Sequence, residues 1–117
     1  MSRIFKESEF REMWNSLSET IYENSLAHGF HGTPELDNIP TKLMLIVSEI
    51  AEAMEAHRKS LSSEHIPGHT GLEEELADAV IRIMDLGYML DLDLADAIIA
   101  KDKFNMTRPY MHGNKTY

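Results

Sequence analysis

The sequence predicts an all-α fold, in the form of a four-helix bundle-like arrangement. Three observations support this. Apolar residues recur at intervals of three and four in four segments, which is the spacing of one helix face. Loops marked by glycine and proline separate the first three segments, and good capping residues precede the last two. No stretch reads convincingly as a strand, so a helical bundle is the expected class.

The first two helices are expected on either side of a loop over residues 29–40. The first is predicted to run from about Ser8 to His28, with Gly29 well placed to end it. Its apolar positions are Phe10, Met13, Trp14, Leu17, Ile21 and Tyr22. The second begins near Pro40, which suits a first helical position, and continues to about Lys59. Its main apolar stripe consists of Leu43, Ile46, Val47, Ile50 and Met54.

The third helix is expected to follow a second loop over residues 60–70. Thr70-Gly-Leu-Glu73 has the capping-box pattern that opens a helix, and this helix should reach about Leu90. It is apolar on most sides, which predicts a buried helix. Its polar exceptions fall within one narrow stripe, which we expect to face an internal cleft: Glu75, Asp78, Arg82 and Asp85.

The fourth helix is predicted to start after Asp93, a good N-cap, and to end before Pro109. On it, Lys101 and Asn105 are four residues apart and share a face. Its apolar residues include Leu94, Ala97, Ile98 and Phe104. The remaining segment, Thr107–Tyr117, is a polar and basic tail.

Length and charge limit the classes of protein to consider. The chain of 117 residues predicts one domain over residues 1–117, with a core small enough that self-association would add stability. The formal net charge of −9 argues against nucleic acid or an anionic membrane as the main partner. Cysteine is absent, which excludes thiolate metal sites. No apolar signal or membrane-length run is seen, so we expect a cytoplasmic protein.

Two acidic pairs carry the chemistry that the sequence suggests. Glu49 and Glu52 are three residues apart on the second helix, and Glu75 and Asp78 are three apart on the third. Each pair therefore lies on one helix face, among apolar residues. Neighbouring antiparallel helices can bring the pairs together, and converging carboxylates repel each other unless cations lie between them. Mg²⁺ or Mn²⁺, which prefer oxygen ligands, are the expected cations.

At this point the sequence resembles a known family, the MazG-like all-α nucleoside triphosphate pyrophosphohydrolases. The resemblance covers roughly residue 40 to the C-terminus, about two-thirds of the chain. One departure is Ser48, where many members carry a further glutamate. The matching motifs are Glu49-x-x-Glu52, twenty-two intervening residues and Glu75-x-x-Asp78; the run from Glu74 to Asp85; Lys101-x-x-x-Asn105-x-x-Arg108-Pro109; and His112-Gly113.

The resemblance implies Mg²⁺-dependent hydrolysis of a ribo- or deoxynucleoside triphosphate to the monophosphate and pyrophosphate. It implies that Glu49, Glu52, Glu75 and Asp78 hold Mg²⁺, for which Mn²⁺ can substitute. A metal-activated water would attack the α-phosphorus. We expect one of the carboxylates, Glu52 in preference to Glu49, to help deprotonate that water.

The candidate substrate-binding residues are Lys101, Asn105, Arg82, Arg108, Phe30 and His31. The first two match phosphate- and sugar-contacting positions of the family; without the resemblance they are exposed polar residues. Arg82 either touches a phosphate or balances the acids beside it in the sequence. Phe30, with the histidines around it, either contacts the base or pins the loop.

Several other interpretations remain open from the sequence. A dUTPase-like or phosphoribosyl-ATP pyrophosphatase-like enzyme would share the carboxylates and differ in the base that it recognises. A di-iron or di-manganese bundle would need Glu-x-x-His motifs, which no predicted helix carries. An acidic helical interaction module without enzymatic activity would use the same carboxylates only as a solvated surface.

Overall fold

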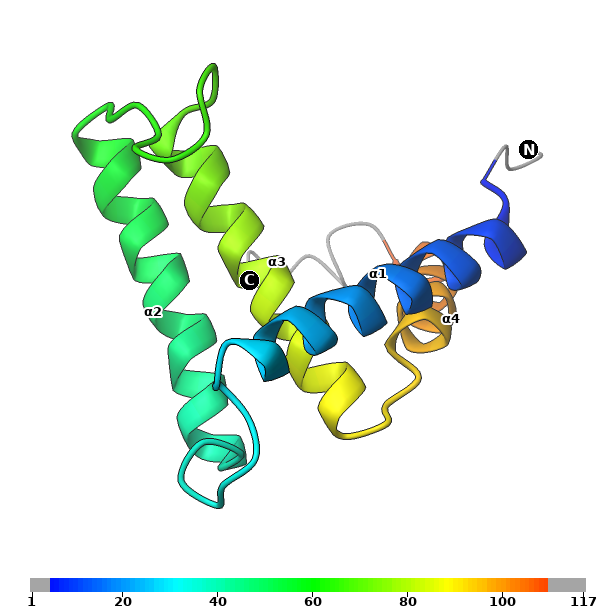
Figure 1. Ribbon diagram of the computed structural model, residues 1–117. Helices are drawn as coiled ribbons and strands as arrows, with labels where there is room; N and C mark the ends of the chain where they lie inside the picture. Colours follow the sequence, from blue (N-terminus) through cyan, green and yellow to red (C-terminus); the bar gives the residue numbers. More distant parts are fainter. Residues whose placement is uncertain (1–4, 110–117) are drawn as a thin grey trace.

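The structure, a computed structural model that describes residues 5–109, is all-helical (Figure 1). Its helices are α1 (Glu7–Ala27), α2 (Ile39–Arg58), α3 (Gly71–Met89) and α4 (Leu94–Met106). The only β-type pairing in this part of the chain is an isolated bridge between Ser62 and Thr70. The predicted all-α class is confirmed. The basic tail beyond residue 109, with His112-Gly113, lies outside the described residues.

Local hydrogen bonds explain where three of the helices begin. The side chain of Asn38 accepts a hydrogen bond from the backbone N–H of Thr41 at 3.0 Å and caps α2. Thr70 and Glu73 form the predicted capping box at the start of α3. The Asp93 side chain caps α4 as expected. These contacts lie within four residues in the sequence, which is why the helix starts can be read without knowing the fold.

The main helix pairs are α2–α3, which are consecutive in the sequence, and α1–α3 and α1–α4, which are not (Figure 1). The α2–α3 pair, an antiparallel hairpin closed by the loop over residues 59–70, has the most extensive contact. The first helix crosses α3, and α4 packs mainly against α1, away from α2. The result is an open arrangement with principal extents of 45 × 37 × 29 Å. None of the helices in the described range is long and apolar enough to cross a membrane.

Helices α2 and α3 both carry widely exposed apolar residues in a single chain. Four residues of the α2 stripe form an uncovered row with exposed fractions of 46–61%: Leu43, Val47, Ile50 and Met54. On α3, Leu76, Val80 and Ile83 are also exposed, so the expectation that this helix is buried on most sides is wrong for one chain. The reason is that α3 is covered mainly by α1 and α2, and nothing in the described residues covers the outer side of α2.

Candidate metal centre

Small residues allow α2 and α3 to approach closely along the stretch that carries the acidic pairs. Ala53 and Ala56 of α2 and Ala79 of α3 are buried. At the start of α3, a Cβ added to Gly71 would lie only 3.1 Å from the Cβ of Ala56, which leaves little room for a larger residue. This close approach lets side chains on the facing sides of both helices reach one point.

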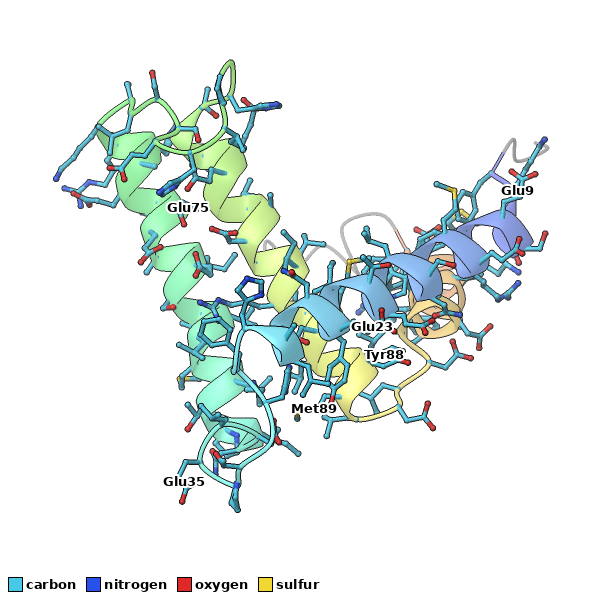
Figure 2. The ribbon with its side chains drawn as sticks, viewed as in Figure 1. Glu9, Glu23, Glu35, Glu75, Tyr88 and Met89 are labelled. Atoms are coloured by element: carbon cyan, nitrogen blue, oxygen red, sulfur yellow. The ribbon has the colours of Figure 1, made fainter. Side chains whose placement is uncertain are left out.

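Three acidic side chains meet there: Glu49 of α2 and Glu75 and Asp78 of α3. Each offers a carboxylate oxygen that lies within 4.8 Å of the other two. Opposite ligands of one Mg²⁺ are about 4.2 Å apart, because each Mg–O distance is about 2.1 Å. The three oxygens therefore need at most a small side-chain adjustment to share an ion. Figure 2 shows Glu75 on the side of α3 that faces α2. The predicted convergence of the two acidic pairs is thus found for three residues.

Glu49 is the buried member of this group. Its Oε1 accepts a hydrogen bond from Nε of Arg82 at 3.0 Å. Its Oε2 is buried and has no hydrogen-bond partner among the described residues, except that a protonated carboxyl of Glu75 could donate to it. Burial alone would raise the pKa of Glu49, but hydrogen bonding with Glu75 and Arg82 outweighs burial and keeps the pKa below its usual value.

In Glu75 and Asp78, the proximity of other carboxylates adds to partial burial and raises the pKa. Partial burial, followed by the proximity of Glu49 and Glu52, raises the pKa of Glu75 to about 8. Partial burial and the charge of Glu49 also raise the pKa of Asp78. A divalent cation would remove this repulsion, and hard cations take oxygen ligands. The all-oxygen donor set and the unpartnered Oε2 of Glu49 therefore fit Mg²⁺ or Mn²⁺.

Glu52, the fourth expected ligand, is not a member of the three-residue group. It is exposed on α2, one turn beyond Glu49, but lies close enough to Glu75 to help raise the pKa of that residue. It lines a separate pocket of about 390 Å³ at the loop end of the hairpin. In that pocket Glu74 accepts hydrogen bonds from Ser63 and His65, which hold its pKa down at about 2 and anchor the loop.

A second pocket, of about 470 Å³, opens on the other side of the carboxylate cluster. Glu49, Asp78 and Arg82 form one part of its wall, so Arg82 lies where the sequence placed it as a candidate. Phe30, also a candidate, lines the same pocket and is 61% exposed. We call this the Phe30 pocket, and its remaining lining residues are Ile21, Asn24, Ser25, Glu35, Leu36, Thr41, Lys42, Leu45 and Ile81.

Lys42 is a member of the Phe30 pocket that the sequence interpretation missed. It precedes Glu49 by seven residues, two helical turns, and so lies on the same face of α2. That spacing was the available signal. This spacing alone does not identify Lys42 as a pocket residue, because the first turns of the helix are mostly exposed. The pocket forms only where the loop over residues 29–38 folds beside Lys42.

The structure does not bring His31 into the Phe30 pocket. Its side chain is only 1% exposed, and Nδ1 lies 2.8 Å from Oδ1 of Asp37 while Nε2 lies 2.9 Å from Oδ1 of Asp85. Its ring also packs against Tyr22, at 4.6 Å between centroids. With both ring nitrogens bonded to carboxylates, His31 ties the loop to α3 and supports the neighbouring Phe30 rather than facing a ligand.

The three candidates near the C-terminus are also not brought to the cluster within one chain. Lys101 and Asn105 lie on α4 and line a shallow surface pocket with Ala97 and Ile98. Lys101 Nζ lies 4.6 Å from the centroid of the Phe104 ring, and the guanidinium of Arg108 lies 5.7 Å from the same centroid. Because α4 packs against α1, these cations are on the opposite side of the molecule from α2 (Figure 1).

Comparisons with protein-family models, with curated proteins and with solved structures were made for the whole chain. None of the three found a match.

Proposed function

We propose that this protein is a divalent-metal-dependent nucleoside triphosphate pyrophosphohydrolase, which cleaves between the α- and β-phosphates to give a monophosphate and pyrophosphate. The observation that carries the proposal is the meeting of Glu49, Glu75 and Asp78 beside the Phe30 pocket, whose wall includes Glu49 and Asp78. We propose that this pocket is the nucleoside pocket. An anionic substrate needs concentrated positive charge in a protein whose net charge is −9. The resemblance of the two acidic motifs to the MazG-like enzymes favours the same activity.

Glu49, Glu75 and Asp78 would hold Mg²⁺, or Mn²⁺ in its place. When bound, the ion supplies positive charge at the phosphates and lowers the pKa of water that it coordinates. Glu52 lies beside this group without belonging to it, which suits the role of general base toward the attacking water. Arg82 pairs with Glu49 in the structure and has a 42% exposed side chain, so it can turn toward a phosphate.

The proposed enzyme is a homo-oligomer, either a dimer or a dimer of dimers. Uncovered apolar rows on α2 and α3 support this, since exposed apolar patches of this extent are typical of association surfaces. A second copy would also explain the remote positions of Lys101 and Asn105. In an oligomer, α4 of one copy can approach the nucleoside pocket of another, so that each site takes residues from two chains.

The test is a panel of ribo- and deoxynucleoside triphosphates assayed for pyrophosphate release with Mg²⁺, Mn²⁺ or EDTA. We expect metal-dependent release of pyrophosphate and monophosphate, and a loss of at least 100-fold in kcat/KM for Glu49→Gln and Asp78→Asn. Lys59→Gln, at the C-cap of α2 and paired with Glu55, is the matched control. The proposal is wrong if the wild-type protein hydrolyses no triphosphate, or if either acidic variant retains wild-type activity.

The same panel addresses the related activities, since a dUTPase-like or phosphoribosyl-ATP pyrophosphatase-like enzyme would share the carboxylates. A non-enzymatic interaction module is the other candidate, favoured by the exposed apolar rows. Thermal melting separates that candidate, because a site that binds Mg²⁺ raises the melting temperature by mass action. If the acids only form a solvated surface, Mg²⁺ should change the melting temperature equally in the wild type and in Glu49→Gln.

A further inference from the structure

Lys42, Leu45 and Glu49 lie on one face of α2, at spacings of three and four residues. All three line the nucleoside pocket. Because a helix rises 1.5 Å per residue, Lys42 lies about 10 Å along the helix from the carboxylate cluster. That separation is comparable in scale to the distance between the α-phosphate of a nucleotide and the edge of its base.

Within residues 5–109, Lys42 lacks the carboxylate partner that Arg82 has in the same pocket and that Lys59 has at the end of α2. Among the residues that the structure describes, it forms no ion pair, whereas Arg82 is paired with Glu49 and Lys59 with Glu55. Its Nζ donates one long hydrogen bond, 3.4 Å, to the backbone carbonyl of Phe30. An ammonium group has three N–H donors, so Lys42 keeps donors for a ligand.

The walls around Lys42 suit a flat apolar ring. Phe30, Leu36, Leu45 and Ile81 line the same pocket, and together they give it a larger apolar than polar surface. Phe30 is held in place through the neighbouring His31, whose bonds to Asp37 and Asp85 fix the loop. An aromatic side chain supported in this way can stack on any of the nucleobases, because every base has a flat π-face.

Resting on the proposed function, we infer that Lys42 reads the base of the substrate and selects bases that present a carbonyl oxygen at the edge facing it. The phosphates lie at the carboxylate cluster, the base stacks on Phe30, and Lys42 donates to the base in the way that it donates to the Phe30 carbonyl. Lysine is a donor without acceptor capacity, so a 6-oxo or 4-oxo group is accepted and a 6-amino or 4-amino group is rejected.

The experiment compares two matched substrate pairs that differ at this group and in the proton on the adjacent ring nitrogen: inosine triphosphate with ATP, and UTP with CTP, each in ribo and deoxyribo forms. We expect wild-type kcat/KM to favour the oxo member of at least one pair by about 10- to 100-fold, the range of one hydrogen bond to a charged donor. In Lys42→Met this ratio should fall to near one. Lys42→Arg should retain much of it, and Lys59→Met, the control on the same helix, should retain all of it.

Three results would overturn the inference. One is a wild-type protein that does not favour the oxo members, and another is an unchanged ratio in Lys42→Met. The third is a uniform loss for both members of each pair, which would place Lys42 on the phosphates instead. A calorimetric titration with IMP against AMP, and UMP against CMP, tests the base preference even if no triphosphate is hydrolysed. Absence of hydrolysis with intact oxo-selective binding would defeat the proposed function and leave the role of Lys42 standing.

Discussion

Nε of Arg82 donates a hydrogen bond to Oε1 of Glu49 at 3.0 Å and so links α3 to α2 at the carboxylate cluster. Arg82 is the only cation within 4.0 Å of the three clustered acids among the described residues. It therefore offsets part of the negative charge in the absence of a metal ion. A cation bound at Oε2 of Glu49 would share one carboxylate with the guanidinium on Oε1 and repel it, so the ion pair and metal binding are coupled.

This coupling predicts the behaviour of Arg82→Gln. The metal-free variant should be less stable by about 1 kcal/mol, a small value because the guanidinium is 42% exposed. Its melting temperature should rise more with Mg²⁺ than that of the wild type, since no guanidinium competes for Glu49. Thermal melting across a Mg²⁺ titration measures both effects. Arg58→Gln, which removes an exposed arginine near Glu55, is the control, and a smaller Mg²⁺ response in Arg82→Gln would contradict the coupling.

The pKa of Glu75, raised to about 8, predicts a pH-dependent stability in the absence of divalent cations. In the unfolded chain this carboxyl titrates near 4.5, so between pH 4.5 and 8 the folded protein holds more protons than the unfolded chain. The stabilisation is fully present below pH 4.5 and is lost as the pH rises through 8. Urea unfolding in EDTA should show the free energy of unfolding falling across this window.

The variant Glu75→Gln should flatten that part of the profile, because an amide does not titrate. Glu64→Gln, a change of the same kind at an exposed loop position, should leave the wild-type slope in place. If the difference between the wild type and Glu75→Gln does not change with pH between 5 and 8, the raised pKa of Glu75 is refuted.

The buried His31 should contribute strongly to folding stability. Replacement by leucine leaves the carboxylates of Asp37 and Asp85 without the donor that they share. We expect a loss of about 2 to 3 kcal/mol in the free energy of unfolding, measured with urea. His28→Leu, at an exposed position in the same loop, should cost far less, because its Nδ1 contacts only a carbonyl within its own helix turn. Equal losses for the two variants would show that His31 is not a special anchor.

The uncovered row on α2 predicts the effect of charge at its centre. The double variant Val47→Glu and Ile50→Glu should convert the oligomer to monomers, as measured by light scattering after size exclusion, because carboxylates cannot be buried unpaired in an apolar interface. Lys59→Glu changes the charge of the same helix by two units at a position beside Glu55 and should leave the assembly intact. If the wild-type protein is monomeric at micromolar concentration, the proposed homo-oligomer is wrong.

The position of Lys101 on α4 predicts that sites are shared between chains. Glu49→Gln and Lys101→Met should each reduce hydrolysis strongly as homo-oligomers. Mixed oligomers of the two variants should regain part of the wild-type activity, since one site in the mixture would combine the intact carboxylates of one chain with the intact Lys101 of the other. No recovery on mixing, with exchange of chains verified, would place Lys101 outside the shared site.

Local interactions made much of the fold predictable. The caps at Asn38, Thr70 and Asp93 act over three or four residues, and helical spacing of apolar residues is equally local, so the helix bounds agree with the expected ones to within a few residues. Those parts of the site that depend only on the spacing of residues along a helix could also be predicted. Glu75 and Asp78 share a face on any helix, and Glu49 lies on the facing side of the preceding one.

Tertiary contacts decided the other features of the fold and the site, because they join residues that are far apart in the sequence and that no local pattern relates. His31 reaches Asp85 across fifty-four positions, Lys42 becomes part of a pocket only when the loop folds over it, and Glu52 lies beside Glu75 without joining the three-residue cluster. Sequence alone determined the four helices and the acids that they carry. Only the packing of α2 on α3 decided which acids meet, and it left an apolar row uncovered because one chain has no further helix to place against it.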